Sequence, residues 1–482
     1  MISRQFIKSS FIYTVAGSLP MASAVVLLPF YVGYLSTGLY GALAIYLALS
    51  MLAQIVVTYS FDTSLYIHYH DFKSDKARLA EFVSSSFNFM LLLGACVLGI
   101  ATLTGDLAFD ALFSGQDMSF FPYGVLSVLT GVFQALFKVN SSLLQSSEQP
   151  TRFFWSNLVN FSLIAVLTIA GLIIFPDSLT GPVGARALAA LISGGGAWLR
   201  ISGMYGIRFN YPLLWSTFGF NTYSFIYQLQ LWAVNYFDRI LMVFFLPLNQ
   251  VGVYDFAFKC MLVVEFGLNG LFNSFFPKVI SHVAEQRTKG TTIEINRYYH
   301  GLAAAAVLMV AGCILAFPVV LGFFEIKTGY MDALVYLPFI GILYLLKPLR
   351  LYASMPYSVL KYTRPLPVYY LVVTFVKVGL MIILIPHFGV NGVIVASAFA
   401  LITEILLLFA GSRNRFAFNN LNGYKLIVLP VFFGLIILIS ELVPVAINQH
   451  VLHLLYIAAG ILLLLWVYRN EFRLIDPLKL MR

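Results

Sequence analysis

The chain is a succession of long apolar segments that short polar connections separate. A helix needs about 20 predominantly apolar residues to cross the hydrocarbon core of a bilayer. Of the 482 residues, 60% are hydrophobic and only 10% are charged. The apolar runs therefore predict an all-α polytopic membrane protein with about fourteen transmembrane helices, and they exclude a soluble enzyme. The predicted spans are 9–35, 40–66, 82–104, 120–145, 153–175, 183–204, 214–245, 252–276, 298–320, 333–355, 366–385, 392–411, 426–444 and 452–468.

The basic residues predict the orientation of these helices. Twenty-one of the 29 Lys and Arg residues fall in the two terminal segments and in alternate connections, whereas Lys327 alone falls in the opposite set of connections. Because cytoplasmic connections are enriched in Lys and Arg, both termini are expected in the cytoplasm. The net charge of +9 is thus a signal of membrane topology, and we expect no nucleic-acid partner.

Short motifs recur six predicted helices apart. A Gly-x-Tyr unit at 38–40 returns at 252–254, and a Gly-x-x-Gly unit at 181–184 returns at 389–392. The two offsets are nearly equal, which favours two six-helix halves in a parallel pseudo-repeat, followed by two further helices. The alternative is that Gly recurs wherever a helix begins near the membrane interface. The predicted domains are residues 1–210 for the N-terminal half, 211–412 for the C-terminal half and 413–482 for the last two helices with a cytoplasmic tail.

Several basic side chains fall inside the predicted spans. An ionisable group in hydrocarbon is costly, so it usually faces a partner or a water-filled cavity. Arg holds a phosphate with paired donors, and Lys acts as a compact charge. These bases therefore suit a cavity for an amphiphile with an anionic head, although structural ion pairs and snorkelling to the interface are the alternative. The candidate substrate-binding residues are Lys138, Arg239, Lys259, Lys347, Arg350 and Lys377.

Two pairs of neighbouring residues constrain this set further. Asp238 and Arg239 are adjacent and point in different directions, so each needs a partner on another helix. We expect Asp238 to be an inter-helix partner and Arg239 to belong to the site. Lys347 and Arg350 share a helix face, where two like charges repel unless water or an anion lies between them. An anion site and cytoplasmic snorkelling are both compatible with that spacing.

Acidic side chains inside the spans are candidates for ion coupling. Asp62, Glu265 and Glu404 could bind a proton or a sodium ion, since a carboxylate in low dielectric is readily neutralised. Pairing with one of the bases is the alternative for each acid. Asp255 and Lys259 are four residues apart, with the acid first, which predicts a structural salt bridge.

Other chemistry is poorly supported. Cys96, Cys260 and Cys313 lie in apolar runs, and their number is odd, so neither a disulfide framework nor a thiolate metal site is expected. The tract 68–71, His-Tyr-His-Asp, lacks further metal ligands. No Gly-rich lysine loop for a nucleotide occurs in the sequence. We therefore predict no catalytic residue, no metal and no cofactor beyond a coupling H⁺ or Na⁺.

Four motifs occur in a fixed order along the chain. They are Leu-Leu-Pro-Phe-Tyr at 27–31, Gly-Leu-Tyr-Gly at 38–41, Asn-Tyr-Phe-Asp-Arg-Ile-Leu at 235–241 and His-Phe-Gly-Val-Asn-Gly at 387–392. In order and spacing they resemble the polysaccharide transporters typified by Wzx O-antigen flippases, in the multidrug/oligosaccharidyl-lipid/polysaccharide exporter superfamily. The resemblance covers essentially the whole chain.

The resemblance implies a flippase, and not an enzyme, in the bacterial inner membrane. It implies alternating access that moves an undecaprenyl-pyrophosphate-linked oligosaccharide to the periplasmic leaflet, with the polysaccharide polymerase and the chain-length machinery as potential partners. None of the motifs identifies the sugar. A lipid II flippase, a cation-coupled multidrug exporter of the same superfamily and, more remotely, a polysaccharide polymerase or ligase stay open. The spans hold as many bases as acids, which favours an anionic cargo over a cationic drug.

Overall fold

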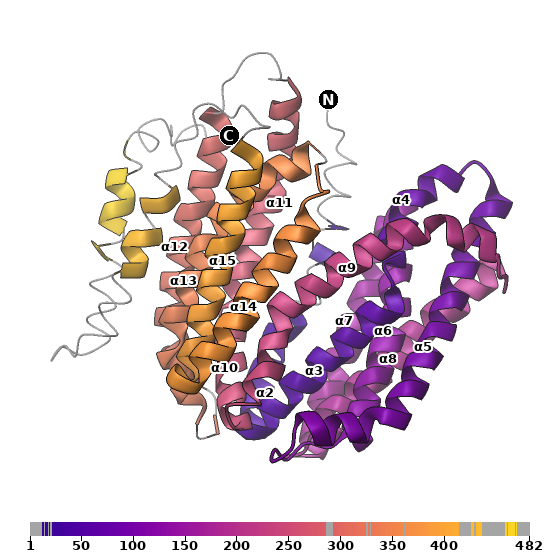
Figure 1. Cartoon of the computed structure of the whole chain (residues 1–482), viewed down its shortest axis with the longest axis horizontal. Coiled ribbons are helices and arrows are strands. Elements are labelled where there is room, and N and C mark those ends of the chain that lie inside the picture. Colours follow the sequence, from indigo (N-terminus) through magenta and orange to yellow (C-terminus); the bar gives the residue numbers. More distant parts are fainter. Residues whose placement is uncertain are drawn as a thin grey trace. The chain divides into compact units, whose positions relative to one another are not determined.

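The chain folds as a set of long helices (Figure 1). The computed structural model describes residues 12–13, 15–17, 19, 22–285, 293–323, 326–327, 329–360, 362–413, 426–428, 430–435, 458–459, 461–467 and 469, in which every regular element is helical. The elements are α2 (Leu28–Tyr34), α3 (Thr37–Thr58), α4 (Phe61–Phe72), α5 (Lys76–Leu112), the π-helical turn η1 (Phe120–Gly124), α6 (Val125–Ser146), α7 (Pro150–Ile174), α8 (Thr180–Tyr205), α9 (Tyr211–Met242), α10 (Leu248–Cys260), α11 (Leu262–Glu285), α12 (Ile293–Gly322), the 3₁₀ turn η2 (Tyr330–Val335), α13 (Leu337–Val359), α14 (Leu366–Phe388) and α15 (Val390–Arg413).

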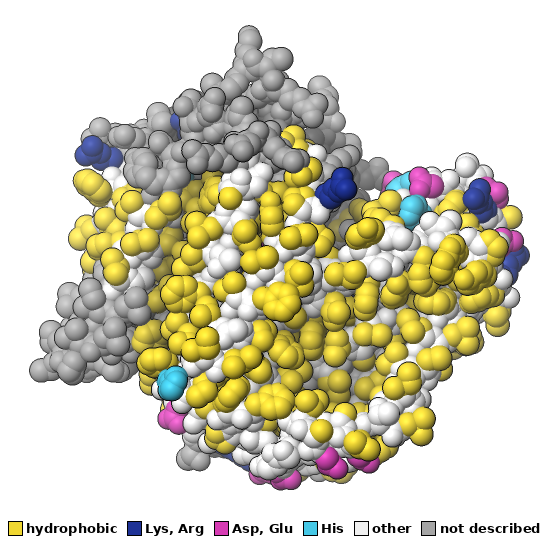
Figure 2. All heavy atoms as spheres, in the orientation of Figure 1, with side chains coloured by type: hydrophobic (Ala, Val, Ile, Leu, Met, Phe, Trp, Pro, Cys, Tyr) yellow, Lys and Arg dark blue, Asp and Glu magenta, His cyan; other side chains and the backbone are white. Residues whose placement is uncertain are grey.

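The helices have the length and the surface that a bilayer requires. Within the described residues, seven helical segments are long and apolar enough to cross a membrane. Their apolar side chains are exposed along the middle of the helix: Leu103 and Leu107 of α5 are 86% and 78% exposed. Figure 2 shows hydrophobic side chains over the middle of the drawn face and charged side chains toward the helix ends. The protein is therefore an all-α polytopic membrane protein.

Each predicted span from 40–66 to 392–411 falls on helical segments, although α5 continues eight residues beyond the predicted 82–104 and α11 nine residues beyond the predicted 252–276. Two of these spans are interrupted: 40–66 is α3 and α4, and 252–276 is α10 and α11. The predicted spans 426–444 and 452–468, and most of 9–35 before α2, lie largely outside the described residues.

Contacts between helices divide the chain into two compact units. The first comprises Met1–Asp255, Ile326–Tyr330 and Met381–Val390, and the second comprises Phe256–Glu325, Met331–Leu380 and Asn391–Arg482. The predicted domains 1–210, 211–412 and 413–482 follow a sequence repeat and not contacts, so those boundaries stay a prediction.

Helix α6 is the centre of the first unit. It packs against α3, α4, α5, α7 and α8, and small residues make this possible because they let helix backbones approach closely. A Cβ on Gly131 of α6 would meet the backbone oxygen of Ser50 in α3. A Cβ on Gly194 of α8 would meet the backbone oxygen of Phe133 in α6. The rigid core of this unit is thus built around one helix.

In the second unit, α11, α12 and α13 pack against one another. Tyr299 of α12 and Tyr352 of α13 meet edge to face, with ring centroids 5.0 Å apart. Gly341 of α13 faces Val310 of α12 without room for a side chain. The helices that carry Glu265, Lys347 and Arg350 are therefore closely packed.

Gly41 in α3 and Gly252 in α10 lie at one helix crossing. A Cβ on Gly41 would meet the backbone oxygen of Leu248, and a Cβ on Gly252 would meet the backbone oxygen of Thr37. The two contacts are reciprocal, which is the pattern that two equivalent elements form about a twofold axis. Gly252 begins the second Gly-x-Tyr unit, whereas Gly41 directly follows the first one at 38–40, so the crossing does not superimpose the two units residue by residue. The extent of the repeat stays a prediction.

We expect Gly41→Ala to lower the thermal unfolding midpoint of the purified protein. The new methyl group meets backbone atoms, which cannot rotate away, and overpacking of this kind costs about 1–3 kcal/mol. Gly38→Ala, three residues earlier on the same helix, is the matched control because a Cβ there meets nothing within 4 Å. Equal midpoints for the two variants would contradict the close crossing.

Candidate functional site

The second predicted span is broken at Tyr59 and Ser60. Their φ angles are 41° and 57°, in the left-handed region that costs an L-residue about 1–2 kcal/mol. Helix α9 holds the break: the Tyr59 hydroxyl hydrogen-bonds to Thr222 Oγ1 at 2.8 Å, and its ring stacks on Phe225 at 5.1 Å. As a result α4 begins at Phe61, and Asp62 lies in its first turn.

Asp62 forms an ion pair with Lys138 of α6. The distance from Asp62 Oδ2 to Lys138 Nζ is 2.9 Å. Gln228 of α9 accepts from Lys138 Nζ at 3.1 Å and donates to Asp62 Oδ1 at 3.3 Å and to Ser60 Oγ at 2.9 Å. The Lys138 side chain is 38% exposed. Because an ammonium group is costly against lipid, the exposed part of Lys138 is expected to face water.

Glu265 and Lys347 form a second pair, in the second unit. Glu265 lies in the first turn of α11, and its Oε1 atom is 2.6 Å from Lys347 Nζ of α13. Tyr344, one turn earlier on α13, donates its hydroxyl hydrogen to Glu265 at 3.5 Å, and the Lys347 ammonium lies 4.5 Å from its ring centroid. Both charged side chains are about one quarter exposed.

Arg350 of α13 and Glu404 of α15 form a third pair. Arg350 Nε donates to Glu404 Oε1 at 2.6 Å, and Arg350 Nη2 donates to the Tyr370 hydroxyl of α14 at 3.0 Å. Glu404 is buried, whereas Arg350 is partly exposed. Lys347 and Arg350 thus each have a carboxylate of their own, and they do not share one counter-ion between them.

The structure therefore joins the predicted acids to predicted bases, one to one. Asp62, Glu265 and Glu404 were candidates for ion coupling, and their partners were candidates for substrate binding. Each pair joins helices that are distant in sequence and keeps part of the base exposed. A group of this kind can exchange one anion for another, since an incoming phosphate competes with the carboxylate for the same donors. The two predicted roles stay predictions.

Arg239 is located differently, inside a closed cluster. Its side chain is 3% exposed, and it lies between Asp238 Oδ1 at 2.6 Å and Asp255 Oδ1 at 3.1 Å. The Tyr254 hydroxyl donates to the second oxygen of Asp238 at 2.9 Å. The Tyr254 hydrogen bond joins Asp238 of α9 to α10. Asp238 and the adjacent Arg239 also pair directly, contrary to the expectation that they point in different directions, because the flexible Arg239 side chain folds back onto its neighbour. The role of Asp238 as an inter-helix partner stays a prediction. In this structure Arg239 is enclosed by carboxylates and does not reach an open surface.

The remaining candidates are Lys259 and Lys377. Lys259 is partly buried in the last turn of α10, and Lys377 of α14 is 5% exposed. Their substrate roles, and the salt bridge between Asp255 and Lys259, stay predictions.

Sequence reasoning missed the neutral members of these pairs. Gln228 and Tyr370 hydrogen-bond to the charged groups, and Ser60 accepts a hydrogen bond from Gln228. Gln228 could have been predicted from the sequence, because a polar amide in the middle of an apolar span needs a hydrogen-bond partner just as a charged group does. In the part of the chain that the structure describes, no three His, Cys, Asp or Glu side chains are grouped closely enough for a metal ion.

Comparison with solved structures identifies the fold. The lipid II flippase MurJ in an inward closed conformation has a TM-score of 0.67 and 16% identity, and the match covers 99% of this chain and 100% of MurJ. An inward-facing multidrug resistance MATE transporter of the MOP superfamily also has a TM-score of 0.67 and 16% identity, over 82% of this chain and 94% of that chain. An outward-facing MATE transporter has a TM-score of 0.52. The predicted fold class is thus confirmed.

Comparison with sequences is narrower. No curated protein matches the chain. The family model described as "Polysaccharide biosynthesis protein" matches residues 6–284, which is more than half of the chain. That segment contains the broken second span and the Asp62–Lys138 pair. The chain therefore belongs to the polysaccharide biosynthesis protein family.

Proposed function

We propose that the chain is a flippase, and not an enzyme, for undecaprenyl-pyrophosphate-linked oligosaccharide, the repeat unit of an O-antigen or a related polysaccharide. It would move this cargo from the cytoplasmic to the periplasmic leaflet of the bacterial inner membrane by alternating access. The observation that carries the proposal is the set of three base–carboxylate pairs that join different helices, each with a partly exposed base. Exposed bases at these positions suit a charged, water-solvated head group.

Each pair can work as an exchange site. While cargo is absent, the carboxylate neutralises the base. The pyrophosphate then takes over the donors of Lys138 or Arg350 and displaces Asp62 or Glu404. A displaced carboxylate in a low-dielectric setting is neutralised by a proton or a sodium ion. Release of the cargo on the other side returns the base to its carboxylate and expels that ion. Cargo movement and ion movement are then coupled at the same base.

A lipid II flippase is the second candidate, because the MurJ structure matches nearly the whole chain. Its cargo also carries a pyrophosphate, so the same three pairs would serve it. A cation-coupled multidrug exporter would use the acids of the pairs for a cationic drug and would leave the bases without a role in binding.

The test is complementation of three Gram-negative strains. The first lacks its O-antigen flippase, the second is depleted of its lipid II flippase, and the third lacks its drug exporters. We expect the chain to restore surface polysaccharide and to clear accumulated lipid-linked precursor in the first strain. Because the sugar is unspecified, flippase-null strains with several different repeat units should be used. Rescue of the second strain alone would identify the lipid II flippase, and drug resistance alone would overturn the anionic cargo.

Lys138→Gln tests whether the rescue depends on the exchange site. We expect it to reduce rescue by about tenfold or more, since a hydrogen bond to a charged group contributes about 1.5–3 kcal/mol. Lys73→Gln is the matched control, because Lys73 is an exposed base that follows α4. Full rescue by Lys138→Gln at normal expression would exclude this lysine from the cargo path.

A further inference from the structure

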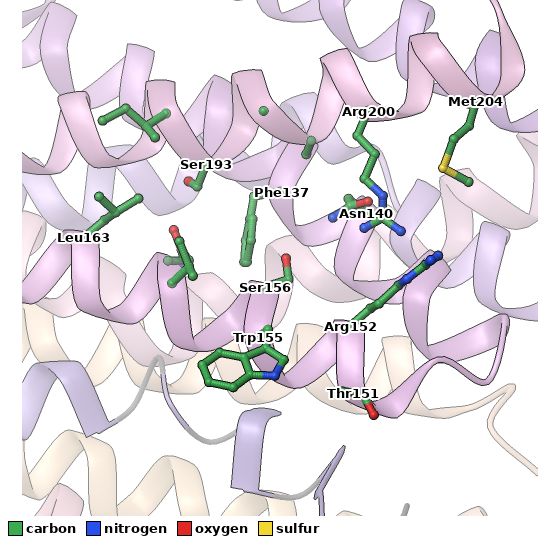
Figure 3. Close-up of a pocket in the computed structure, with 15 residues that line it drawn as sticks. Phe137, Asn140, Thr151, Arg152, Trp155, Ser156, Leu163, Ser193, Arg200 and Met204 are labelled. Atoms are coloured by element: carbon green, nitrogen blue, oxygen red, sulfur yellow. The ribbon is translucent and has the colours of Figure 1, made fainter.

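A groove of about 630 Å³ lies on the first unit, between α7 and α8, with α6 as its floor (Figure 3). Its walls are mostly apolar: Trp155 and Val159 of α7 and Ile192 of α8 line it, and all three are about half exposed. Small residues such as Gly196 leave the space open, since a Cβ there would meet nothing within 4 Å. None of the residues that line the groove belongs to the three base–carboxylate pairs.

Two arginines lie at one end of the groove. In Figure 3, Arg152 of α7 and Arg200 of α8 extend into the same space from opposite walls. Arg152 donates to Gln149 at 2.8 Å, and within the described residues neither arginine pairs with a carboxylate. The buried Asn140 lies at the same end, and its Oδ1 atom has no hydrogen-bond partner among those residues. The end of the groove therefore holds two positive charges and an unsatisfied amide.

We propose that the groove binds an anionic phospholipid of the cytoplasmic leaflet. The phosphate sits between Arg152 and Arg200, and an acyl chain follows Trp155, Val159 and Ile192. Two guanidinium groups that face one open space repel each other, and a shared phosphate removes that repulsion through charge-assisted hydrogen bonds. Basic pockets between transmembrane helices on the cytoplasmic side are known lipid head-group sites.

Charge and position favour a membrane lipid over a soluble anion. The arginines belong to the connections that the positive-inside count assigns to the cytoplasm, so the head group lies at the interface. The rest of the lining is mostly apolar, and we expect it to face the hydrocarbon, where free phosphate has no contact to make. A phospholipid contacts both parts of the groove, with its phosphate at the two arginines and an acyl chain along the apolar walls.

The experiment is a thermal-unfolding titration of the full chain, delipidated in mild detergent, with phosphatidylglycerol or with zwitterionic phosphatidylcholine. We expect phosphatidylglycerol to raise the unfolding midpoint of the wild type more than phosphatidylcholine does. Arg152→Gln with Arg200→Gln should weaken the apparent affinity for phosphatidylglycerol at least about tenfold. Lys73→Gln with Lys76→Gln removes two exposed bases of the predicted cytoplasmic side and should leave the affinity unchanged.

A second pair of variants tests the apolar part. Gly196→Leu fills the groove and should also weaken phosphatidylglycerol binding. Gly195→Leu is the matched control, because a Cβ there likewise meets nothing within 4 Å but the residue does not line the groove. Equal stabilisation by the two lipids, or undiminished binding in the double arginine variant and in Gly196→Leu, would overturn the proposal. So would stabilisation by inorganic phosphate or by undecaprenyl phosphate in place of phosphatidylglycerol.

Discussion

Arg239→Ala is expected to destabilise the protein more than any other single substitution of a charged residue considered above. Arg239 lies between Asp238 and Asp255, and all three side chains are buried. Removal of one partner from a buried ionic cluster costs about 3–5 kcal/mol, because the remaining charges lose their counter-ion but not their desolvation. We expect poor yield and an unfolding midpoint that is lower by about 3–10 °C, since each kcal/mol lowers the midpoint of a chain of this size by about 1–2 °C.

Arg78→Ala is the matched control for that variant. Arg78 is an exposed arginine that lies over the Phe72 ring at 5.1 Å, and loss of such a surface contact changes stability by about 0.5 kcal/mol or less. Arg239→Lys keeps the charge and should fall between the wild type and Arg239→Ala. If Arg239→Ala unfolded like the wild type and yet lost transport, Arg239 would be a cargo ligand, as the sequence suggested, and not the centre of a structural cluster.

The second large effect is expected at the Arg350–Glu404 pair. Arg350→Ala should reduce transport by about 10- to 100-fold, because it removes the charged donors that would receive the pyrophosphate. Glu404→Gln should keep cargo binding and lose the dependence of transport on the ion gradient. Both effects are measured in proteoliposomes, from the flipping of a labelled lipid-linked oligosaccharide with and without a proton or sodium gradient.

A charge swap separates a structural pair from an exchange site. In the variant Arg350→Glu with Glu404→Arg the ion pair can re-form, so the unfolding midpoint should recover relative to Arg350→Ala. Transport should not recover, because the base then lies on α15 in place of the carboxylate. Tyr370→Phe is the control for the neighbouring hydrogen bond. Transport at the wild-type level in the swapped variant would show that the pair serves only to hold α13 and α15 together.

The sequence identified the charged residues inside the spans and left open whether they pair with one another, but it could not say which base meets which acid. For Lys347 and Arg350 an anion site and snorkelling were both compatible with the spacing, and in the structure each base has its own carboxylate. Arg152 and Arg200 counted only toward the topology, and yet they face one groove without a carboxylate partner among the described residues. Repulsion between two like charges correctly indicates that an anion is needed between them. Spacing along one helix, however, cannot show whether a carboxylate or a second base on another helix lies nearby.

By itself the sequence determined the all-helical membrane fold and the positions of most spans. It could do so because a helix crosses the bilayer when it is long and apolar enough, and both properties depend only on a continuous stretch of sequence. Only the tertiary structure decided which base meets which acid and where the second span breaks. Asp62 and its hydrogen-bond partner Gln228 are 166 residues apart, and the break at Tyr59 and Ser60 contains neither Gly nor Pro. Contacts from α9 hold that break in a conformation that local propensity disfavours, so no local rule could have predicted it.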